Sequence, residues 1–507
     1  MNRRDVICSA TALAATAALP AGVLAQDEPA PGFGFEDVAA RAQALAAAPF
    51  VAPDSTLLPP FADLNYDQYR AIRFRRHRDP WAGHGDFRLD LLPPGLFYNQ
   101  PVEISLVQNG VELPQAFNAS MFDFDPSQFP DGVTPGDSGK MGFSGFRIRT
   151  PLNRPDVMDE VIVFQGASYF RAVSRGTLYG ISARGLALGT GQPGGEEFPI
   201  FRAFWIHTPA PRDRSVTVHA LLDSKSVAGA YEFTISPGAE TVVETRLALF
   251  PRVNLANVGI APLTSMFWFG PGDRSGIDDY RNAVHDSDGL QMLTGSDRRL
   301  WRALNNPPGL QFSNFMDVNP RGFGLAQRER SFDHYNDMEA RYELRPSAWI
   351  APRGDWGKGA VTLIEIPVSN EFNDNIVSFW QPAEPLARGQ RHDFAYDLSF
   401  APQTPDSAPI SRVLQTRAGA SVNEPKARSY VIDFSSDVLD GTEPVAMIET
   451  SAGKITGTHL VRLPREDRVR LAFQFWPEGA KLAELSARLD GAEGPLSETW
   501  FGRWTEG

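Results

Sequence analysis

The amino-acid sequence predicts an all-β protein in which two β-sandwiches follow one another along the chain. Short alternations of apolar and polar residues recur throughout it, and few segments show the 3.6-residue periodicity of an amphipathic helix. With 44 Gly and 41 Pro among 507 residues, turn-forming residues are frequent enough to separate many short strands. Numerous strands, short turns and few helices are together typical of β-sandwich folds.

The first 25 residues, 1–25, have the three parts of a signal peptide. Arg3 and Arg4 supply positive charge, residues 10–19 form a short apolar run, and residues 23–25 are small or apolar, as a signal peptidase requires. The apolar run is too short to span a bilayer. We therefore expect the protein to be exported. The paired arginines indicate the twin-arginine route, and the general secretory route is the alternative.

The composition argues against several classes of function. The only cysteine, Cys8, lies inside the predicted signal peptide, so the mature chain is expected to form no disulfide and to use no cysteine as nucleophile or zinc ligand. A formal net charge of −13 disfavours nucleic acid and anionic membranes as partners, but it is compatible with a neutral polymer. No later segment is long and apolar enough for a membrane span. No motif in the sequence proposes a metal or a cofactor.

Three segments are predicted to be helical. Residues 36–48 begin with acidic side chains, place apolar residues on one face and end before a proline. A second helix is expected to be capped by Ser296, with Leu300 and Leu304 on one side and a proline at its end. A short third helix is expected to run from Asn65 to Phe74.

Most of the remaining sequence has the pattern of strands and turns. Residues 102–113 alternate apolar and polar side chains on either side of Asn109-Gly110, a turn pair that favours positive φ, and they predict a β-hairpin. Residues 216–220 alternate in the same way. Residues 361–368 are mostly apolar, as expected of a strand that is covered on both faces.

A linker is predicted at residues 401–410, which contain three prolines and show no periodic pattern. It would separate a large domain at residues 26–400 from a smaller one at 411–507. Five or more short strands in about a hundred residues suit an immunoglobulin-like sandwich. We expect these strands at 429–434, 456–463, 469–476, 482–489 and 497–504.

Two polar clusters in apolar surroundings carry the candidate chemistry. Residues 284–290 read Val-His-Asp-Ser-Asp-Gly-Leu and include Asp286, and residues 370–375 read Asn-Glu-Phe-Asn-Asp-Asn and include Glu371 and Asp374. Carboxyl groups on both sides of a glycosidic bond supply an acid and a base, and amides bind sugar hydroxyls. The residues alone leave open a simpler interpretation, in which the first cluster is an Asx-rich turn and the second is a solvated loop.

Further stretches in a constant order along the chain carry a resemblance to a known family. They read YGISARGLAL at 179–188, EEFPIFRAFWI at 196–206, LLDSKSVAGAYEF at 221–233, APLTSMFWFG at 261–270, VHDSDGL at 284–290, FGLAQRERSFDHYNDMEARYELRPSAWIAPRGDWGKGAVTLIEIP at 323–367, NEFNDNIVSFWQP at 370–382 and SETWFGRW at 497–504. With these motifs the chain resembles the periplasmic glucan biosynthesis protein G/D family, OpgG/OpgD, also called MdoG/MdoD. The resemblance implies a periplasmic protein with a galactose-mutarotase-like β-sandwich followed by an immunoglobulin-like domain.

The resemblance also implies a role in making osmoregulated periplasmic glucans, whose backbone is β-1,2-linked glucose. Some members of the family are inverting β-1,2-glucanases, and some act as transglycosylases. Their two catalytic aspartates match Asp286 and Asp374, and we favour Asp374 as the acid. Glu371 and Tyr342 match cleft positions, and Tyr342 and Arg345 are expected to orient sugars or the carboxylates.

Three tryptophans, Trp349, Trp356 and Trp380, are candidates for stacking on sugar rings, with plain core packing as the alternative for each. The sequence departs from relatives at 368–370 and at Phe372, which affects substrate handling but not the carboxylate pair. We therefore predict an enzyme that cuts or transfers β-1,2-glucan, without metal or cofactor. The alternative is a non-catalytic factor that binds or guides the glucan, and a homodimer stays open.

Overall fold

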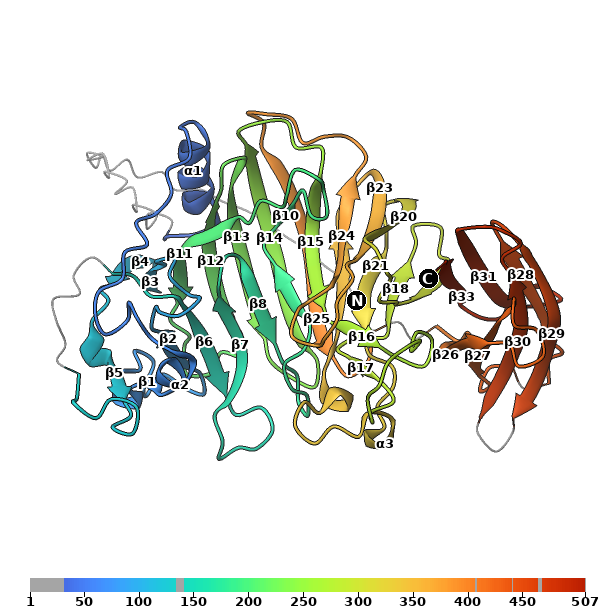
Figure 1. The fold of residues 1–507 in the computed structure, drawn as a ribbon. Coiled ribbons are helices and arrows are strands. Elements are labelled where there is room, and N and C mark those ends of the chain that lie inside the picture. Colours follow the sequence, from blue (N-terminus) through green and yellow to red (C-terminus); the bar gives the residue numbers. More distant parts are fainter. Residues whose placement is uncertain (1–31, 134–140, 406–407, 440, 464–466, 507) are drawn as a thin grey trace, which may run out of the picture. The chain divides into compact units, whose positions relative to one another are not determined.

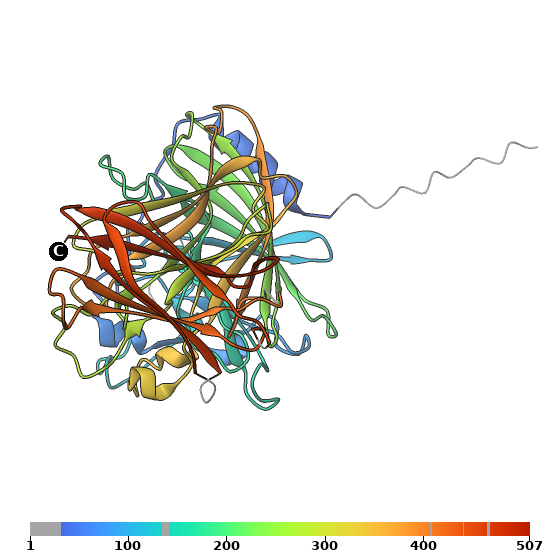
Figure 2. The ribbon, with the colours of Figure 1, turned by 90° about the vertical axis from the view of Figure 1, so that its right-hand side faces the viewer.

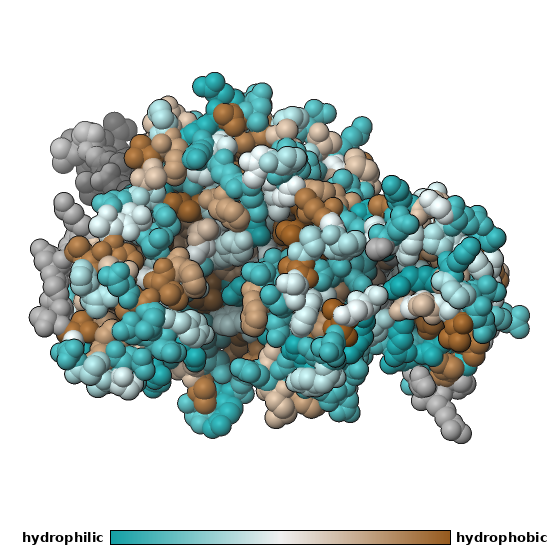
Figure 3. All heavy atoms as spheres, in the orientation of Figure 1, coloured by the Kyte–Doolittle hydropathy of each residue, from teal (hydrophilic) through white to brown (hydrophobic). Residues whose placement is uncertain are grey.

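The computed structural model describes residues 32–133, 141–405, 408–439, 441–463 and 467–506, and the predicted signal peptide at 1–25 lies outside them. Figure 1 shows that strands make up nearly all of the regular secondary structure of this part of the chain, with few and short helices. The prediction of an all-β protein is confirmed. Figure 3 shows hydrophilic and hydrophobic residues interspersed over the face that it displays. Within the described residues, no helix is long and apolar enough to cross a membrane.

Helix α1 (Phe35–Ala46) confirms the first predicted helix to within two residues at each end. Glu36 and Asp37 lie in its first turn, where the helix dipole favours negative charge. Its buried face packs against Trp205, Ala230 and other side chains that form a cluster separate from the main core. Helix α1 therefore covers the outer face of a sheet whose inner face packs on that core.

The other two helix predictions are corrected by the structure. Residues 65–74 form only one short helix, α2 (Tyr66–Arg70), followed by strand β1 (Ile72–Phe74), which pairs with β5 (Phe122–Phe124). The helix expected after Ser296 is wrong, because residues 299–303 form strand β19 (Arg299–Ala303). Leu300 and Leu304 share a face in a strand as well as in a helix, since residues four apart satisfy both periods. Trp301 packs into a different hydrophobic cluster from Leu300, so both faces of β19 are buried.

One layer of the fold is a ten-stranded antiparallel sheet. Its strands follow the order β2-β6-β7-β8-β9-β15-β24-β23-β20, with β10 paired to β15. Their bounds are β2 (Arg88–Leu92), β6 (Gly145–Thr150), β7 (Asp159–Gln165), β8 (Tyr169–Ala172), β9 (Ser182–Arg184), β10 (Ala187–Leu188), β15 (Val258–Ser265), β20 (Gln311–Val318), β23 (Lys358–Glu365) and β24 (Ile376–Pro382). Strand β23 is buried from Gly359 to Glu365, as its apolar sequence predicts.

The facing layer is a fifteen-stranded sheet in the order β28-β31-β33-β19-β18-β21-β22-β25-β14-β13-β12-β11-β3-β4, with β32 paired to β31. Its strands are antiparallel to their neighbours except at β11 with β3 and at β19 with β33. Their bounds are β3 (Glu103–Gln108), β4 (Val111–Gln115), β11 (Ile200–His207), β12 (Val216–Asp223), β13 (Val227–Ser236), β14 (Thr241–Pro251), β18 (Gly289–Leu293), β21 (Gly322–Ala326), β22 (Ser347–Arg353), β25 (His392–Ala401), β28 (Val445–Thr450), β31 (Leu482–Gly491), β32 (Gly494–Pro495) and β33 (Thr499–Thr505).

The predicted hairpin is confirmed as β3 and β4. Asn109 and Gly110 have φ angles of 54° and 77°, and Gln108 pairs with Val111 across a two-residue turn. The strand predicted at 216–220 is confirmed as part of β12, but its polar residue His219 is buried along with the apolar ones.

The main core fills the space between the two sheets. Phe164 of β7 lies with its ring centroid 5.3 Å from that of Phe233 on β13, and Phe146 of β6 lies 5.0 Å from Phe204 on β11. These contacts join side chains from opposite layers, so burial of apolar surface holds the sandwich together. The described N-terminal residues therefore form the β-sandwich that the strand pattern predicts.

The C-terminal residues form two further layers, which face the viewer in Figure 2. A four-stranded antiparallel sheet has the order β26-β27-β30-β29, and β28, β31 and β33 lie opposite it around a second core. Its strands are β26 (Val413–Ala420), β27 (Arg428–Ser435), β29 (Lys454–Leu463) and β30 (Arg468–Trp476). The five predicted strands correspond to β27, β29, β30, β31 and β33. A separate immunoglobulin-like domain at 411–507 remains a prediction, because β33 also pairs with β19 of the large sheet.

Limited proteolysis tests the predicted linker. We expect the first cut within residues 401–410, since exposed connections rich in proline are where few contacts cross between domains. The two fragments should still elute together from a sizing column, because β19 and β33 remain paired, and should separate in denaturant. Mass spectrometry of the fragments gives the cut site. A first cut within 280–380 would contradict the predicted boundary.

Candidate functional site

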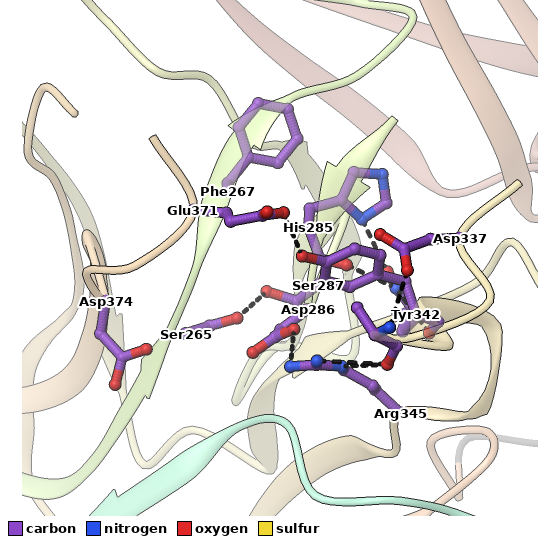
Figure 4. A network of polar contacts seen from close by, with 12 residues as sticks. Ser265, Phe267, His285, Asp286, Ser287, Asp337, Tyr342, Arg345, Glu371 and Asp374 are labelled. Carbon is purple, nitrogen blue, oxygen red and sulfur yellow. Dashed lines mark hydrogen bonds and ion pairs between the residues drawn. The ribbon is translucent and has the colours of Figure 1, made fainter. Parts of the chain in front are cut away.

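A cavity of about 740 Å³ brings the two polar clusters together. Asp286, Tyr342, Arg345, Glu371 and Asp374 all line it, although they come from three segments far apart in the sequence. Figure 4 shows these side chains around a common space, with Asp374 set apart from the network that surrounds Asp286. The fold therefore gathers the five non-tryptophan site residues that the sequence predicts.

Asp286 lies between two short strands at the inner end of the cavity. It follows strand β17 (Val284–His285), which pairs with β16 (Phe267–Phe269), and its backbone N–H donates to the carbonyl of Met266 at 2.8 Å. Its side chain accepts a hydrogen bond from Arg345 Nη1 at 2.6 Å. This ion pair fixes the direction of the carboxylate.

Burial raises the pKa of Asp286 to about 6. The positive charge of Arg345 opposes this rise, and the negative charge of Asp374 adds to it. The influence of Asp374 means that the two carboxyl groups interact electrostatically across the cavity. A carboxyl group with a pKa near neutrality is suited to proton transfer, and such groups are concentrated at functional sites.

Asp374 approaches the cavity from the loop that joins β23 to β24. Its side chain is 32% exposed, and its carboxylate lies 3.7 Å from Arg171 Nη2 on β8. The neighbouring Asn375 is fully buried and fixes this part of the loop. Its amide nitrogen donates to the carbonyls of Phe267 and Ile366, and its Oδ1 accepts the N–H of Phe267 at 2.8 Å. Asn375 thus ties the segment that carries Asp374 to β16, which pairs with the strand before Asp286.

A network of charged groups holds Glu371 at the cavity wall. Tyr342 donates its hydroxyl proton to Glu371 Oε2 at 2.6 Å, and Arg281 Nη1 donates to the same oxygen at 2.8 Å. Arg281 also bonds to Asp279 and to Asp337. Burial, reinforced by the negative charge of Glu371, raises the pKa of Tyr342, so this phenol stays protonated and remains a hydrogen-bond donor.

Arg345 connects Asp286 with the network of charged groups around Glu371 and Tyr342. Its guanidinium lies 4.6 Å from the ring centroid of Tyr342 and also donates to the carbonyl of Ala340. Its contact with Asp286 places it where a group that orients a carboxylate is expected. Sequence reasoning missed Arg281 and Asn375. Asn375 lies in the polar cluster at 370–375, which could have pointed to it. No motif surrounds Arg281.

The structure corrects the three tryptophan assignments. Trp349, Trp356 and Trp380 are 4%, 5% and 0% exposed, and none of them is among the described residues that line the cavity. Trp356, in the loop after β22, and Trp380, on β24, pack in the main core, whereas the Trp349 ring lies against Gly322 of the neighbouring strand β21. The exposed aromatic surface at the cavity comes instead from Tyr280 and Phe372, which are 78% and 85% exposed.

The arrangement has the chemical parts of a carbohydrate site. Five carboxyl side chains, three arginines and four aromatic rings line one open cavity. Among the described residues, no group of three His, Cys, Asp or Glu side chains is placed to hold a metal ion. The site can therefore supply proton donors, proton acceptors and sugar-binding surfaces from its own side chains.

Comparison with known proteins identifies similar chains. A family described as "Periplasmic glucan biosynthesis protein, MdoG" matches residues 33–504. The chain is 44% identical over 511 residues to "Glucans biosynthesis protein G" of Bradyrhizobium diazoefficiens and 46% identical over 512 residues to that of Rhodopseudomonas palustris BisA53, with 100% of both chains covered in each case. It is 45% identical over 484 residues to "Glucans biosynthesis protein G" of Vibrio cholerae, which covers 93% of this chain and 87% of the relative.

Proposed function

The chain belongs to the periplasmic glucan biosynthesis protein family MdoG, and from this premise we propose that it acts in the periplasm on a β-1,2-linked glucan. It would cut the backbone as an inverting glycoside hydrolase or transfer it as a transglycosylase. The observation that carries this proposal is the pairing of Asp286 and Asp374 at one open cavity. A protein that only binds glucan does not need two positioned carboxyl groups.

In the proposed mechanism, Asp286 is the base. Its pKa of about 6 leaves it mostly deprotonated at neutral pH, and Arg345 holds the carboxylate in place. It would accept a proton from the attacking water, directly or through a further hydroxyl, while the water oxygen bonds to the anomeric carbon. Transfer follows the same course when a sugar hydroxyl replaces the water.

Asp374 is then the acid. As the bond between the anomeric carbon and the glycosidic oxygen breaks, Asp374 would give its proton to the leaving oxygen, which becomes a free sugar hydroxyl. Glu371, held by Tyr342 and Arg281, would accept hydrogen bonds from sugar hydroxyls.

The exposed rings at the cavity supply a surface for substrate binding. Tyr280 and Phe372 would stack on the apolar faces of glucose rings, a role for which rigid aromatic side chains are suited. Both rings sit on loops, so they can adapt to the bend of a β-1,2-linked chain.

Incubation of the purified protein with linear β-1,2-glucan tests the proposal. We expect shorter or cyclic chains, and hydrolysis should release a new reducing end of inverted, α configuration, which proton NMR detects in the first minutes. Linear β-1,3- and β-1,4-glucans of similar length serve as controls and should stay intact. If β-1,2-glucan binds but keeps its chain length at every protein concentration, the protein is the non-catalytic glucan-binding factor instead.

A further inference from the structure

A second cavity, of about 970 Å³, lies between β16–β19 and the C-terminal strands β26, β27, β30 and β33. It is larger than the cavity that holds Asp286, which measures about 740 Å³. Both values fall within the range of about 300–1,000 Å³ that is typical of ligand-binding pockets. None of the residues to which the proposed function gives a role lines this second cavity.

The two cavities share a wall. Met266 and Asp286 line the first cavity, whereas Phe267 and His285, their neighbours in sequence, line the second. Successive side chains of an extended chain point to opposite sides, so one pair of short strands presents a face to each cavity. The Phe267 and His285 rings are stacked on the second side, with centroids 5.3 Å apart and planes 10° from parallel. A ligand in the second cavity would therefore rest against the wall that carries Asp286.

Tryptophan is concentrated in the second cavity. Trp301, Trp476, Trp500 and Trp504 line it, which is four of the ten tryptophans of the chain. Trp301 and Trp500 are 3% and 1% exposed, so ring surface for a ligand comes from Trp476 and Trp504, which are half-buried. Flat indole faces beside polar groups are what the apolar faces of sugar rings require, because each sugar also presents hydroxyls at its edge.

The tryptophans that line the second cavity, called the tryptophan wall below, are held in place by contacts with other side chains. Trp500 Nε1 donates to Thr416 Oγ1 and Trp476 Nε1 donates to Thr456 Oγ1, both at 2.9 Å. Arg328 lies over the Trp301 ring at 3.6 Å. Side chains that are already locked lose little conformational entropy on binding, so this wall is organised before a ligand arrives.

The polar groups of the second cavity favour an uncharged ligand with many hydroxyls. Three basic side chains line it together with five acidic ones, so both signs of charge are present and an anionic ligand is disfavoured. Burial raises the pKa of Asp273, and the nearby charge of Arg428 opposes that rise. A carboxylate and a guanidinium side by side can accept from one sugar hydroxyl and donate to the next.

We propose that this cavity is a second carbohydrate-binding site that holds another stretch of the β-1,2-glucan. The identity of the sugar rests on the proposed function above. The site itself rests on the tryptophan wall, the mixed polar lining and the volume of the cavity. It would hold one part of the polymer beside strands β16 and β17, next to Asp286, while another part of the same polymer reacts in the catalytic cavity.

Tryptophan fluorescence separates the two sites. The described residues that line the catalytic cavity include no tryptophan, whereas four line the second cavity. Titration of the Asp374→Asn chain with short linear β-1,2-glucan oligosaccharides should shift tryptophan emission, and calorimetry on the same samples should give two sites per chain. In Trp504→Ala on that background, we expect one class of site to weaken by about tenfold or more, which corresponds to the loss of about 1.4 kcal/mol of binding free energy, and the midpoint of the emission shift to move to higher oligosaccharide concentration by the same factor.

A second variant, which fills the cavity instead of enlarging it, controls for the possibility that Trp504→Ala does not fold. Gly272 lines the second cavity outside the left-handed backbone region, and an added Cβ would come no closer than 3.5 Å to Thr416. Gly272→Leu should therefore fold and should also move the midpoint of the emission shift to higher oligosaccharide concentration. Phe198→Ala is the matched control, because Phe198 is 52% exposed and lines neither cavity.

The outcomes distinguish this inference from the proposed function. One site per chain that is weakened by Phe372→Ala but not by Trp504→Ala or Gly272→Leu would overturn the second site and leave the catalytic proposal standing. One site that is lost in Trp504→Ala and Gly272→Leu but not in Phe372→Ala would support the second site while removing binding at the catalytic cavity. An emission shift with the same midpoint in both second-cavity variants as in their parent would also overturn the inference.

Discussion

Asp374→Asn is expected to lower turnover of linear β-1,2-glucan by about 10²–10⁴-fold, the usual contribution of a general acid or base. Asparagine keeps the shape and hydrogen-bonding capacity of the side chain but has no proton to give to the leaving oxygen. The side chain is 32% exposed and pairs only at 3.7 Å with Arg171, so little stability depends on its charge. Fold and glucan affinity should therefore persist.

Three measurements on the same Asp374→Asn sample decide the matter: thermal stability, glucan affinity and turnover. A β-glycosyl fluoride of the same sugar is the sharpest substrate, because fluoride leaves with little help from an acid. We expect turnover of the fluoride to be largely retained by Asp374→Asn. Asp333→Asn, at an exposed position of helix α3 (Phe332–Tyr335), is the control and should behave as wild type.

Other results for Asp374→Asn would point elsewhere. If Asp374 only shaped a turn, the substitution would lower the melting temperature, and activity would follow the folded fraction. A variant that is stable, binds glucan and turns it over at the wild-type rate would remove Asp374 from the mechanism. Glu371, which lines the same cavity, would then be the next candidate.

Asp286→Asn should lower turnover by a similar factor of about 10²–10⁴, but with a different signature. A base must be deprotonated, so wild-type kcat/KM should fall as pH drops through about 6, the value to which burial raises the pKa of Asp286. The residual activity of Asp286→Asn should not show this fall at low pH, the acid limb of the pH profile. The variant should gain nothing with the fluoride substrate, and added azide should restore part of the turnover by attacking in place of water.

A nearby carboxyl group provides the matched control for this pH limb. Burial raises the pKa of Asp288 to about 6 as well, although its carboxylate accepts the backbone N–H groups of Arg328 and Glu329. Asp288→Asn should keep the acid limb of kcat/KM, since this carboxyl group is not among the residues that line the catalytic cavity. An acid limb that is lost in Asp288→Asn and kept in Asp286→Asn would contradict the assignment of the base.

Stability gives an independent check on Asp286. Its pKa is raised in the folded protein, so the stability that its protonated form contributes is fully present below pH 3.8 and is lost as pH rises through about 6. Asparagine stays neutral throughout. The wild type should therefore lose more stability than Asp286→Asn between pH 4 and pH 7, as thermal melts at each pH would show. The variant also loses the ion pair with Arg345, but this loss does not change with pH and leaves the comparison intact.

The sequence by itself determined the features that depend on local pattern. Alternation and turn residues predicted the hairpin at Asn109-Gly110 and five strands of the C-terminal sheets, but not β26 or β28, because a strand of period two and a turn of positive φ are set by neighbouring residues. The resemblance carried by the motifs identified Asp286 and Asp374. The structure then placed both at one cavity, although no pattern in the chain measures the distance between them.

Only the tertiary structure decided what depends on residues far apart in the chain. The spacing of Leu300 and Leu304 fits a helix and a strand equally well, and pairing with β18 and β33 made the segment a strand. Trp349, Trp356 and Trp380 became core residues, whereas the tryptophans at the second cavity acquired a polar lining from distant strands. Local sequence sets backbone conformation, but the surroundings of a side chain come from the strands that folding brings beside it.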